Sequence, residues 1–417
     1  MLYRDSTKAH DLARYIAQTV MTMNPVAMCV PTNVSDIEKE WKLCAKAGHF
    51  YSPKFTYNKA ELRRISLMGY KVSNYWSELS LNCTPQNQID SAILGVLESR
   101  VCDAILTAEI AASILAKDDA RTKEAIIGIY GEPSASLIAL CYDRIQRPGA
   151  YLNGATSRFD AETLANLQAM KLNAADIRKR FLEVFNFYGF KSWECIIDQQ
   201  VTSAIDARDK TPSGKSQLVI PARKTVDGRA LCSLIGHEIE SHVRGSENSR
   251  ALFGRLLANS PLEPLVNLLA KADNESFYEG VAKMSDVNVN GDNSLPHPYY
   301  VIAIDRALHG DNFAEVAQLV YLLKHTGNTT VQEAVDSSWN ITRRVFRGCT
   351  DMEKGGYAHT KDFGYIDGYY RAQNTPTSYR DYSSMTIMDL RLLEDAGVDL
   401  THPAYPHQDA IQLIVGK

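Results

Sequence analysis

The sequence predicts a mainly α-helical protein with one small mixed or antiparallel β-sheet, in the α+β class. Apolar residues recur at helical spacing through most of the first 170 residues. Short runs typical of β-strands appear later, between residues 193 and 222. The 417 residues suit one large or two medium domains, with 45% hydrophobic and 23% charged residues as in an ordinary globular protein. We expect a helical N-terminal region, residues 1–170, and a second region, residues 171–417, which together could form one compact unit.

Six helices are expected in the first part of the chain, from the spacing of their apolar residues. They span residues 11–22, 34–47, 60–68, 102–115, 134–145 and 161–184. The helix at 102–115 is strongly apolar, which predicts that it is buried. Gly131-Glu132-Pro133 interrupts the pattern before the fifth helix begins.

The expected sheet lies just before the segment that carries the chemistry. Glu194–Ile197 and Gln217–Ala222 are short β-like runs, and the polar stretch between them, residues 206–216, is rich in turn formers. Asp227 is then expected to cap a helix that continues into residues 236–242. More helices follow to about Asn340, and the remaining C-terminal stretch is expected to contain loops and short elements.

The net charge and the cysteine pattern indicate which binding partners and which cellular compartment to expect. The formal net charge of −4 provides no bulk basic field for nucleic acid or an anionic membrane. The eight cysteines are dispersed and form no CxxC pair, which indicates a reducing compartment. The N-terminus lacks a signal-peptide pattern, and no uninterrupted apolar run reaches the ~18 residues of a membrane span. We therefore expect a cytoplasmic protein without a nucleic-acid or membrane partner.

Residues 236–242, Gly-His-Glu-Ile-Glu-Ser-His, carry the main chemical signal. The familiar zinc-binding helix has two histidines at i and i+4 on one face. Here His237 and His242 are five residues apart, which on a regular α-helix turns the second side chain about 140° away. Both could bind one ion if the helix contains a wide π-type turn, a rare feature that is concentrated at functional sites. The alternative is a histidine pair on a solvated helix face.

A catalytic zinc site needs a third protein ligand and an open position for water. Glu279, on a helix further along the chain, is the expected ligand, and Glu275, one turn earlier, competes with it. Gly280 follows Glu279 and is expected to let this helix approach the histidine helix closely. Two neutral imidazoles and one carboxylate would leave a zinc site with a net charge near +1, which lowers the pKa of bound water.

Several motifs resemble the microtubule-associated tyrosine carboxypeptidase family and its bacterial relatives. The family has His-Glu-x-x-x-His followed by Glu-Gly-Leu-Ala, and this chain has HEIESH followed by Glu279-Gly280-Val281-Ala282. The family's later block is similar to 347–351 (RGCTD) and 361–368 (KDFGYIDG), and weaker similarities lie at 52–57 and 130–133. Tyr278 and Val281 replace a glutamine and a leucine of the family. The resemblance implies a zinc carboxypeptidase that removes a C-terminal residue, with tyrosine as the residue that the family's name suggests.

The expected mechanism uses residues next to the metal ligands. Glu238 follows His237 directly and is the candidate general base, which takes a proton from the attacking water and passes it to the leaving amine. Tyr365 is the candidate donor to the oxyanion, with a packed core tyrosine as the alternative. The strand at 217–222 could hold the substrate backbone by strand addition.

Carboxypeptidase action also needs a cation for the substrate's terminal carboxylate. The candidates are Arg244, Arg347 and Lys361, and the alternative for each is a structural ion pair, for example with Glu240, Asp351 or Asp362. The segment Asp286–Gly291 begins like a calcium loop, but position 12 is His297 instead of glutamate, so we do not predict a calcium site.

Together these features predict a zincin-like catalytic region after residue 170, with zinc bound by His237, His242 and Glu279. The predicted function is a metallo-carboxypeptidase that acts on a peptide or protein C-terminus. The alternatives are a zinc endopeptidase with the same site and a non-catalytic regulator that keeps zinc for structure. Glu238 favours an enzyme, because a structural site needs no acid beside the metal.

Overall fold

The computed structural model describes residues 1–147, 157–201, 205–208, 215–272, 276–291, 297–325 and 329–415. It is mainly helical with small sheets, which confirms the α+β class. The chain forms two compact units: unit 1 comprises Met1–Tyr151 and His297–Asp367, and unit 2 comprises Leu152–Pro296 and Gly368–Lys417. The domain boundary expected at residue 170 stays a prediction. A domain is a part of the chain that could fold on its own, whereas these two units are defined by their internal contacts.

Unit 1 is built from helices, with one short antiparallel ribbon between β1 (Leu2–Tyr3) and β2 (Cys83–Thr84). Its helices are α1 (Ser6–Val20), α2 (Val34–Lys46), α3 (Lys59–Asn82), α4 (Gln88–Ala116), α5 (Asp119–Tyr130), α6 (Ala135–Gln146), α13 (Tyr299–Leu308), α14 (Phe313–His325) and α15 (Val331–Val345), with the 3₁₀ turns η1 (Ala27–Cys29) and η6 (Thr360–Phe363). The helix α16 (Gly364–Gln373) begins at the end of unit 1 and continues into unit 2.

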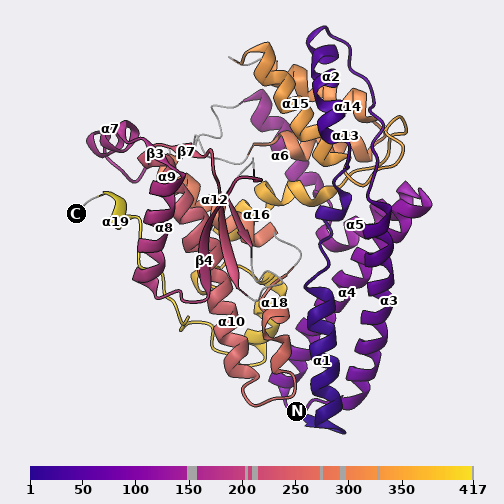
Figure 1. The fold of residues 1–417 in the computed structure, drawn as a ribbon, viewed down its shortest axis with the longest axis vertical. Coiled ribbons are helices and arrows are strands. Elements are labelled where there is room, and N and C mark those ends of the chain that lie inside the picture. Colours follow the sequence, from indigo (N-terminus) through magenta and orange to yellow (C-terminus); the bar gives the residue numbers. More distant parts are fainter. Residues whose placement is uncertain are drawn as a thin grey trace. The chain divides into compact units, whose positions relative to one another are not determined.

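The long helices α3 and α4 run side by side in unit 1 (Figure 1). Both are longer than the predicted segments 60–68 and 102–115. Asn58 caps α3 and Asn87 caps α4, each by accepting backbone N–H groups of the first turn. Gly69 allows the close approach, since a Cβ there would lie 2.1 Å from the Cβ of Ala108. Two capped helices in such close contact extend further than the apolar pattern alone indicated.

An aromatic cluster joins the two sequence segments of unit 1. The rings of Trp41 on α2 and Trp339 on α15 are 5.0 Å apart, and Phe313 on α14 lies 6.1 Å from Trp41. All three side chains are fully buried.

Among the described helices no single one is long and apolar enough to cross a membrane, although α5 and α6 pass that test as a pair bent by 90°.

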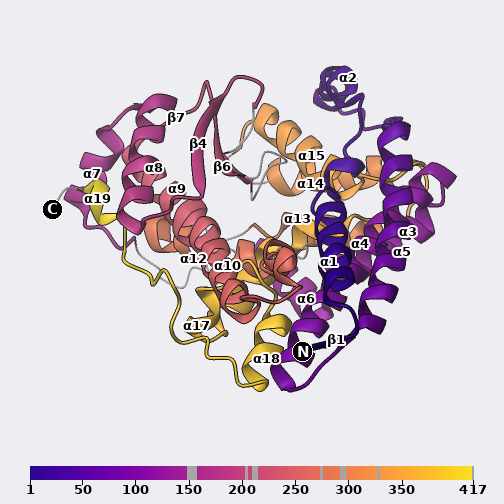
Figure 2. The same ribbon diagram turned by 60° about the horizontal axis from the view of Figure 1, so that its bottom comes forward.

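Unit 2 combines a three-stranded sheet with helices. Its elements are α7 (Ala161–Ala169), β3 (Leu172–Asn173), α8 (Ala174–Tyr188), β4 (Trp193–Asp198), β5 (Asp206–Arg208), β6 (Ser216–Pro221), β7 (Thr225–Val226), α9 (Gly228–Leu234), η3 (Ile235–Val243), α10 (Arg244–Leu256), η4 (Glu263–Leu265), α11 (Val266–Leu269), α12 (Ser276–Asn290), α17 (Thr377–Arg380), α18 (Ile387–Asp395) and α19 (Gln412–Val415). The sheet order is β4-β6-β5, with β4 parallel and β5 antiparallel to β6, so the sheet is mixed. Figure 2 shows β4 and β6 next to each other.

The helix expected at 161–184 is wrong as a single element. The chain leaves the helical conformation after Ala169, forms the two-residue strand β3, and starts α8 at Ala174. The cause is a capping box: the Asn173 side chain accepts the N–H of Asp176, and the Asp176 carboxylate accepts the N–H of Asn173. This pair fixes a new helix start within a continuous apolar pattern.

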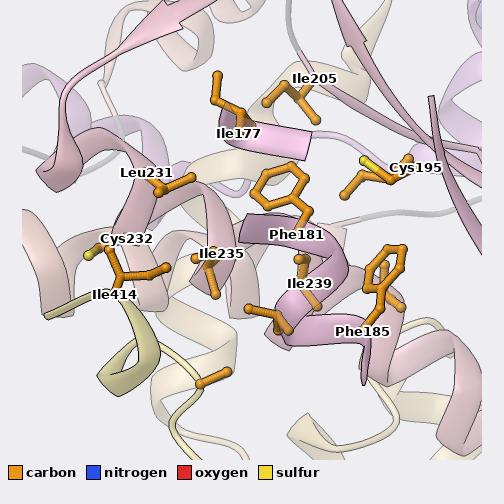
Figure 3. Close-up of a cluster of buried hydrophobic side chains, with 14 of the residues drawn as sticks. Ile177, Phe181, Phe185, Cys195, Ile205, Leu231, Cys232, Ile235, Ile239 and Ile414 are labelled. Carbon is orange, nitrogen blue, oxygen red and sulfur yellow. The ribbon is translucent and has the colours of Figure 1, made fainter. Parts of the chain in front are cut away.

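The core of unit 2 holds the histidine helix in place. Figure 3 shows Phe181 and Phe185 of α8 close to Ile235 and Ile239. Ile235, Ile239 and Val243 are fully buried and repeat every four residues along one side of η3. Because these three side chains pack into the core, they fix the rotation of η3 about its axis. The polar residues between them, such as His237 and His242, therefore lie on the other sides of the helix.

Candidate metal centre

The segment that contains the two histidines is a π-helix. Asp227 accepts the N–H of Ala230 at 2.7 Å and caps α9, as predicted, and α9 continues directly into the π-helix η3, Ile235–Val243. The wide turn expected from the i, i+5 spacing is therefore confirmed. It brings the rings of His237 and His242 to 4.9 Å between centroids, at an interplanar angle of 89°. A regular helix would have turned them apart.

Glu279 on α12 completes a group of three side chains that could hold a metal ion. The nitrogen and oxygen atoms that His237, His242 and Glu279 offer all lie within 4.8 Å of one another. His237 Nε2 is 3.8 Å from Glu279 Oε2. Ligand atoms around a tetrahedral zinc ion lie roughly 3.4 Å apart, given bonds of about 2.1 Å. The donor set and its spacing thus fit zinc, with small side-chain movements.

Asp286, also on α12, orients the ring of His237. Its Oδ2 atom is 3.1 Å from His237 Nδ1, and Ser233 Oγ donates to its Oδ1 at 2.5 Å. Lys283 Nζ donates to Oδ2 at 2.7 Å. A carboxylate that holds one ring nitrogen as a donor leaves the other, Nε2, to bind a metal. His237 Nε2 is the atom that faces Glu279.

These acids also change the proton affinity of His237. Burial would lower the pKa of His237, but the hydrogen bond to Asp286 and the charges of Glu238, Asp286 and Glu279 raise it to about 9. A concentration of negative charge that attracts a proton also attracts a metal cation. Since imidazole binds metals in its neutral form, an ion at this site would take the place of that proton.

Tyr278 and Glu238 flank the ligands. The Tyr278 ring stacks on His242, with centroids 3.7 Å apart and an interplanar angle of 23°. His242 and Glu238 are both buried, with 4% and 7% of their surface exposed. The aromatic face of Tyr278 thus fixes the plane of the second histidine.

The close helix contact predicted at Gly280 occurs with a different helix. The helix α12 does lie close to the histidine helix, as predicted, but Gly280 is not the residue at that contact: a Cβ on Gly280 would lie 2.0 Å from the carbonyl oxygen of Gly368 on α16. Gly236 is the small residue at the contact between η3 and α12, because a Cβ there would lie 3.0 Å from the Cβ of Ser285 on α12. The helix α12 is therefore confined between two neighbours, one on each side of Glu279.

Arg244 has a structural environment within unit 2. Its guanidinium forms an ion pair with Asp381, and its Nε donates to the Glu240 carbonyl at 2.8 Å. Only 4% of the residue is exposed. This is the kind of structural ion pair considered as the alternative to substrate binding, with Asp381 as a partner that the sequence did not indicate.

Arg347, Lys361 and Tyr365 lie in unit 1. Arg347 pairs with the fully buried carboxylate of Asp362, which Arg344 also contacts at 2.5 Å. Burial would raise the pKa of Asp362, but the charges of the two arginines hold it well below its usual range. Arg344 also donates to the hydroxyl of Tyr365 at 3.4 Å. The late block of the sequence thus forms one charged cluster, and the catalytic and binding roles of its members stay predictions.

Two further expectations concern the surroundings of the ligands. Strand addition at β6 is excluded over Gln217–Val219, because β4 and β5 pair with both edges of the strand there. Glu275, the competing third ligand, lies outside the described residues.

Asp286 is the residue at this site that sequence reasoning missed. It appeared only as the first position of a rejected calcium loop. Its signal was positional: it follows Glu279 by seven residues, and residues two turns apart share one face of a helix. An acid on the same face as a predicted carboxylate ligand is a candidate partner for a ligand histidine.

Comparison with known proteins gives one family match. Residues 299–392 match the model of the microtubule-associated tyrosine carboxypeptidase family, which confirms the resemblance over that segment. The matched segment includes the late block with Arg347, Lys361 and Tyr365. It does not include the π-helix η3 or α12, because both precede residue 299. A search of curated proteins found no match.

Proposed function

We propose that this protein is a zinc-dependent metallo-carboxypeptidase whose metal would be held by His237, His242 and Glu279. The observation that carries the proposal is the π-helix, which brings two histidines five residues apart to within 4.9 Å, beside a carboxylate from α12. Such a turn is unusual enough to suggest a functional cause. The family match supports the carboxypeptidase part of the proposal. Unit 2 would then be a zincin-like catalytic region.

Glu238 would perform the proton transfers. When bound, zinc would supply positive charge that polarises the scissile carbonyl and acidifies water. Glu238 would accept a proton from the attacking water and deliver it to the nitrogen of the leaving amine. Its position directly after a ligand, with 7% of the residue exposed, suits a carboxylate that works in a partly dehydrated site. Tyr365 remains the proposed donor to the oxyanion.

A cation for the terminal carboxylate would set the cleavage position. A bound carboxylate fixes the scissile bond one residue from the C-terminus. Lys361 is the preferred candidate, because the guanidinium groups of Arg244 and Arg347 are both buried and paired, with Asp381 and Asp362 respectively. The proposed substrate is a peptide or protein C-terminus, and the cytoplasm is the proposed location, since the cysteines are dispersed and all free.

The decisive experiment compares one peptide as its free acid and as its C-terminal amide, with products identified by mass. A carboxypeptidase should release one C-terminal residue from the acid and lose most activity on the amide, because amidation removes only the charge that positions the substrate. Glu238→Gln should retain zinc and lose several orders of magnitude in rate, because it cannot accept the proton.

The other outcomes identify the alternatives. Equal cleavage of acid and amide, or internal products, would indicate a zinc endopeptidase. Zinc binding without turnover in the unmodified protein, across a mixed peptide library, would indicate a non-catalytic zinc protein. Unchanged turnover in Glu238→Gln would remove Glu238 from the mechanism.

A further inference from the structure

Unit 1 contains a pocket that has no part in the proposed chemistry. It has a volume of about 420 Å³ and lies between the segment 54–63, the end of α4 and Thr350. Its apolar lining includes Phe55, Leu62 and Ile114, each less than 10% exposed. Leu62 and Ile114 belong to α3 and α4, the two tightly packed helices, so this wall is rigid. The volume falls in the range of small-molecule sites.

Four cations surround this apolar lining. They are Lys54, Lys59, Arg63 and Lys117, all exposed, and none of them forms an ion pair within the part of the chain that the structure describes. Among the described residues that line the pocket there is no acid. Arg64, one residue further along α3, is different, because it pairs with Glu61. In a chain of net charge −4, four unpaired cations around one opening are a local excess of positive charge.

The two acids that follow Lys117 in the sequence have other partners. Asp118 caps α5 by accepting the N–H of Arg121 at 3.1 Å. Asp119 accepts the N–H of Thr350 at 2.8 Å and its hydroxyl at 2.9 Å, which fixes Thr350 in the pocket wall. Lys117 has a left-handed backbone, with φ of 59°, at a position where glycine or asparagine is usual. The local structure keeps a charged side chain at the rim at some conformational cost.

We propose that this pocket binds an amphipathic organic anion, with the apolar body among Phe55, Leu62 and Ile114 and a carboxylate or phosphate head among the four cations. An exposed lysine contributes little to a single ion pair. Four cations around a concave apolar surface raise the local concentration of anions, while burial of the apolar body supplies most of the affinity. A compact pocket accommodates such a molecule better than an extended chain.

The test uses three ligands with the same ten-carbon body: decanoate, decyl phosphate and decanol. Calorimetric titration of the full chain, below the concentration at which the ligands aggregate, should show one site per chain for the anions. Decanol should bind about tenfold more weakly or worse, because it lacks the charge. The ratio of decanoate to decyl phosphate affinity distinguishes the two head groups. Binding is measured without turnover, so the result is independent of the proposed peptidase activity.

Variants locate the site. Lys59→Glu combined with Arg63→Glu should weaken both anions by about tenfold and leave decanol unchanged. Leu115→Trp should fill the pocket and weaken all three ligands. The matched control is Lys71→Glu, which reverses an exposed charge on the same helix α3 away from the pocket and should have no effect. Melting temperatures verify that the variants are folded.

Other results would overturn the proposal. Decanol affinity equal to that of the anions would show that the charges have no role, and anion binding unchanged in both pocket variants would place the site elsewhere. A polyglutamate peptide or a single-stranded oligonucleotide that binds tightly and competes with decanoate would identify a polyanion as the ligand.

Discussion

At the scale of single residues, the orientation of the two candidate histidine ligands depends on neighbouring side chains that would not bind the metal themselves. Asp286 holds the Nδ1 side of His237, and Tyr278 stacks on His242, so each ligand ring has one neighbour that fixes its plane. Both neighbours come from α12, the helix that also carries Glu279. The arrangement of the three candidate ligands therefore depends on η3 and α12 together, and the candidate ligands can be substituted separately from the residues that orient them.

The third ligand is tested by removing each of the two competing glutamates. Purified protein should contain about one zinc per chain, as a three-ligand catalytic site implies. Glu279→Ala should lose most of this zinc, because two histidines alone bind it weakly, whereas Glu275→Ala should retain it. Metal content by atomic emission after dialysis measures both. The reverse pattern would make Glu275 the ligand.

Asp286→Asn tests the support of His237. The substitution keeps the shape but removes the charge, and loss of such a partner typically weakens metal binding about 10–100-fold. Competition with a chelator measures the affinity directly. Asn288→Ala, an exposed position on the same helix, is the control and should bind zinc like the unmodified protein. Equal affinity in both variants would show that Asp286 has no role in metal binding.

At the scale of elements, the sequence was informative where one periodic pattern or one spacing decided the structure. The i, i+5 histidines implied a π-type turn, and the structure contains one. The break between α7 and α8 was missed because the apolar period continues through it, while the capping box at Asn173 and Asp176 decides the outcome. The contact of Gly280 with Gly368 was also unpredictable, because 88 residues separate them in sequence and packing alone brings them together.

Gly280→Ala tests this packing. A Cβ at position 280 would lie 2.0 Å from a backbone oxygen of α16, so one of the two helices must move. We expect a loss of about 1–3 kcal/mol in unfolding free energy and a weaker zinc affinity, since α12 carries Glu279. Gly254→Ala on α10 is the matched control: no atom lies within 4 Å of the new Cβ, and it should stabilise slightly, as alanine does in a helix. Denaturant unfolding and zinc titration measure the two effects.

At the scale of the whole molecule, the order of segments in the chain is different from their grouping in space. Unit 1 is completed by residues 297–367, which follow the main segment of unit 2. A sequence read from one end to the other indicates where composition changes, but it does not show that Trp41 and Trp339 share a core. The family match at 299–392 also crosses the boundary between the units: residues up to Asp367 belong to unit 1, and residues from Gly368 onward belong to unit 2.

The last prediction concerns His359, which ties the stability of unit 1 to pH. The residue is fully buried, its ring lies 5.4 Å from that of Tyr130, and neither ring nitrogen has a hydrogen-bond partner among the described residues. Burial, and next the charge of Arg347, lower its pKa well below the usual value, while Asp362 acts in the opposite direction and Lys361 in the same one.

The sign follows from the difference between the two states. In the unfolded chain a histidine has a pKa of about 6.5. Above that pH both states are neutral and His359 has no effect on stability. As the pH falls below about 6.5, the unfolded state binds a proton that the folded state does not, so folding is destabilised by up to about 1.4 kcal/mol per pH unit. Between about pH 6 and 4.5 this effect precedes the loss of the Asp362 ion pairs, which requires protonation of a carboxylate with a lowered pKa.

Replacing His359 by phenylalanine should therefore make unit 1 less sensitive to acid. The melting temperature of His359→Phe should fall less than that of the unmodified protein between about pH 6 and 4.5, since the titrating group is gone. His10→Gln is the control in the same unit: this residue is exposed on α1, so its replacement should leave the change in melting temperature between the two pH values like that of the unmodified protein. If the melting temperatures of His359→Phe and the unmodified protein fall equally with pH, the prediction is wrong, because His359 then takes up a proton as readily in the folded state as in the unfolded state.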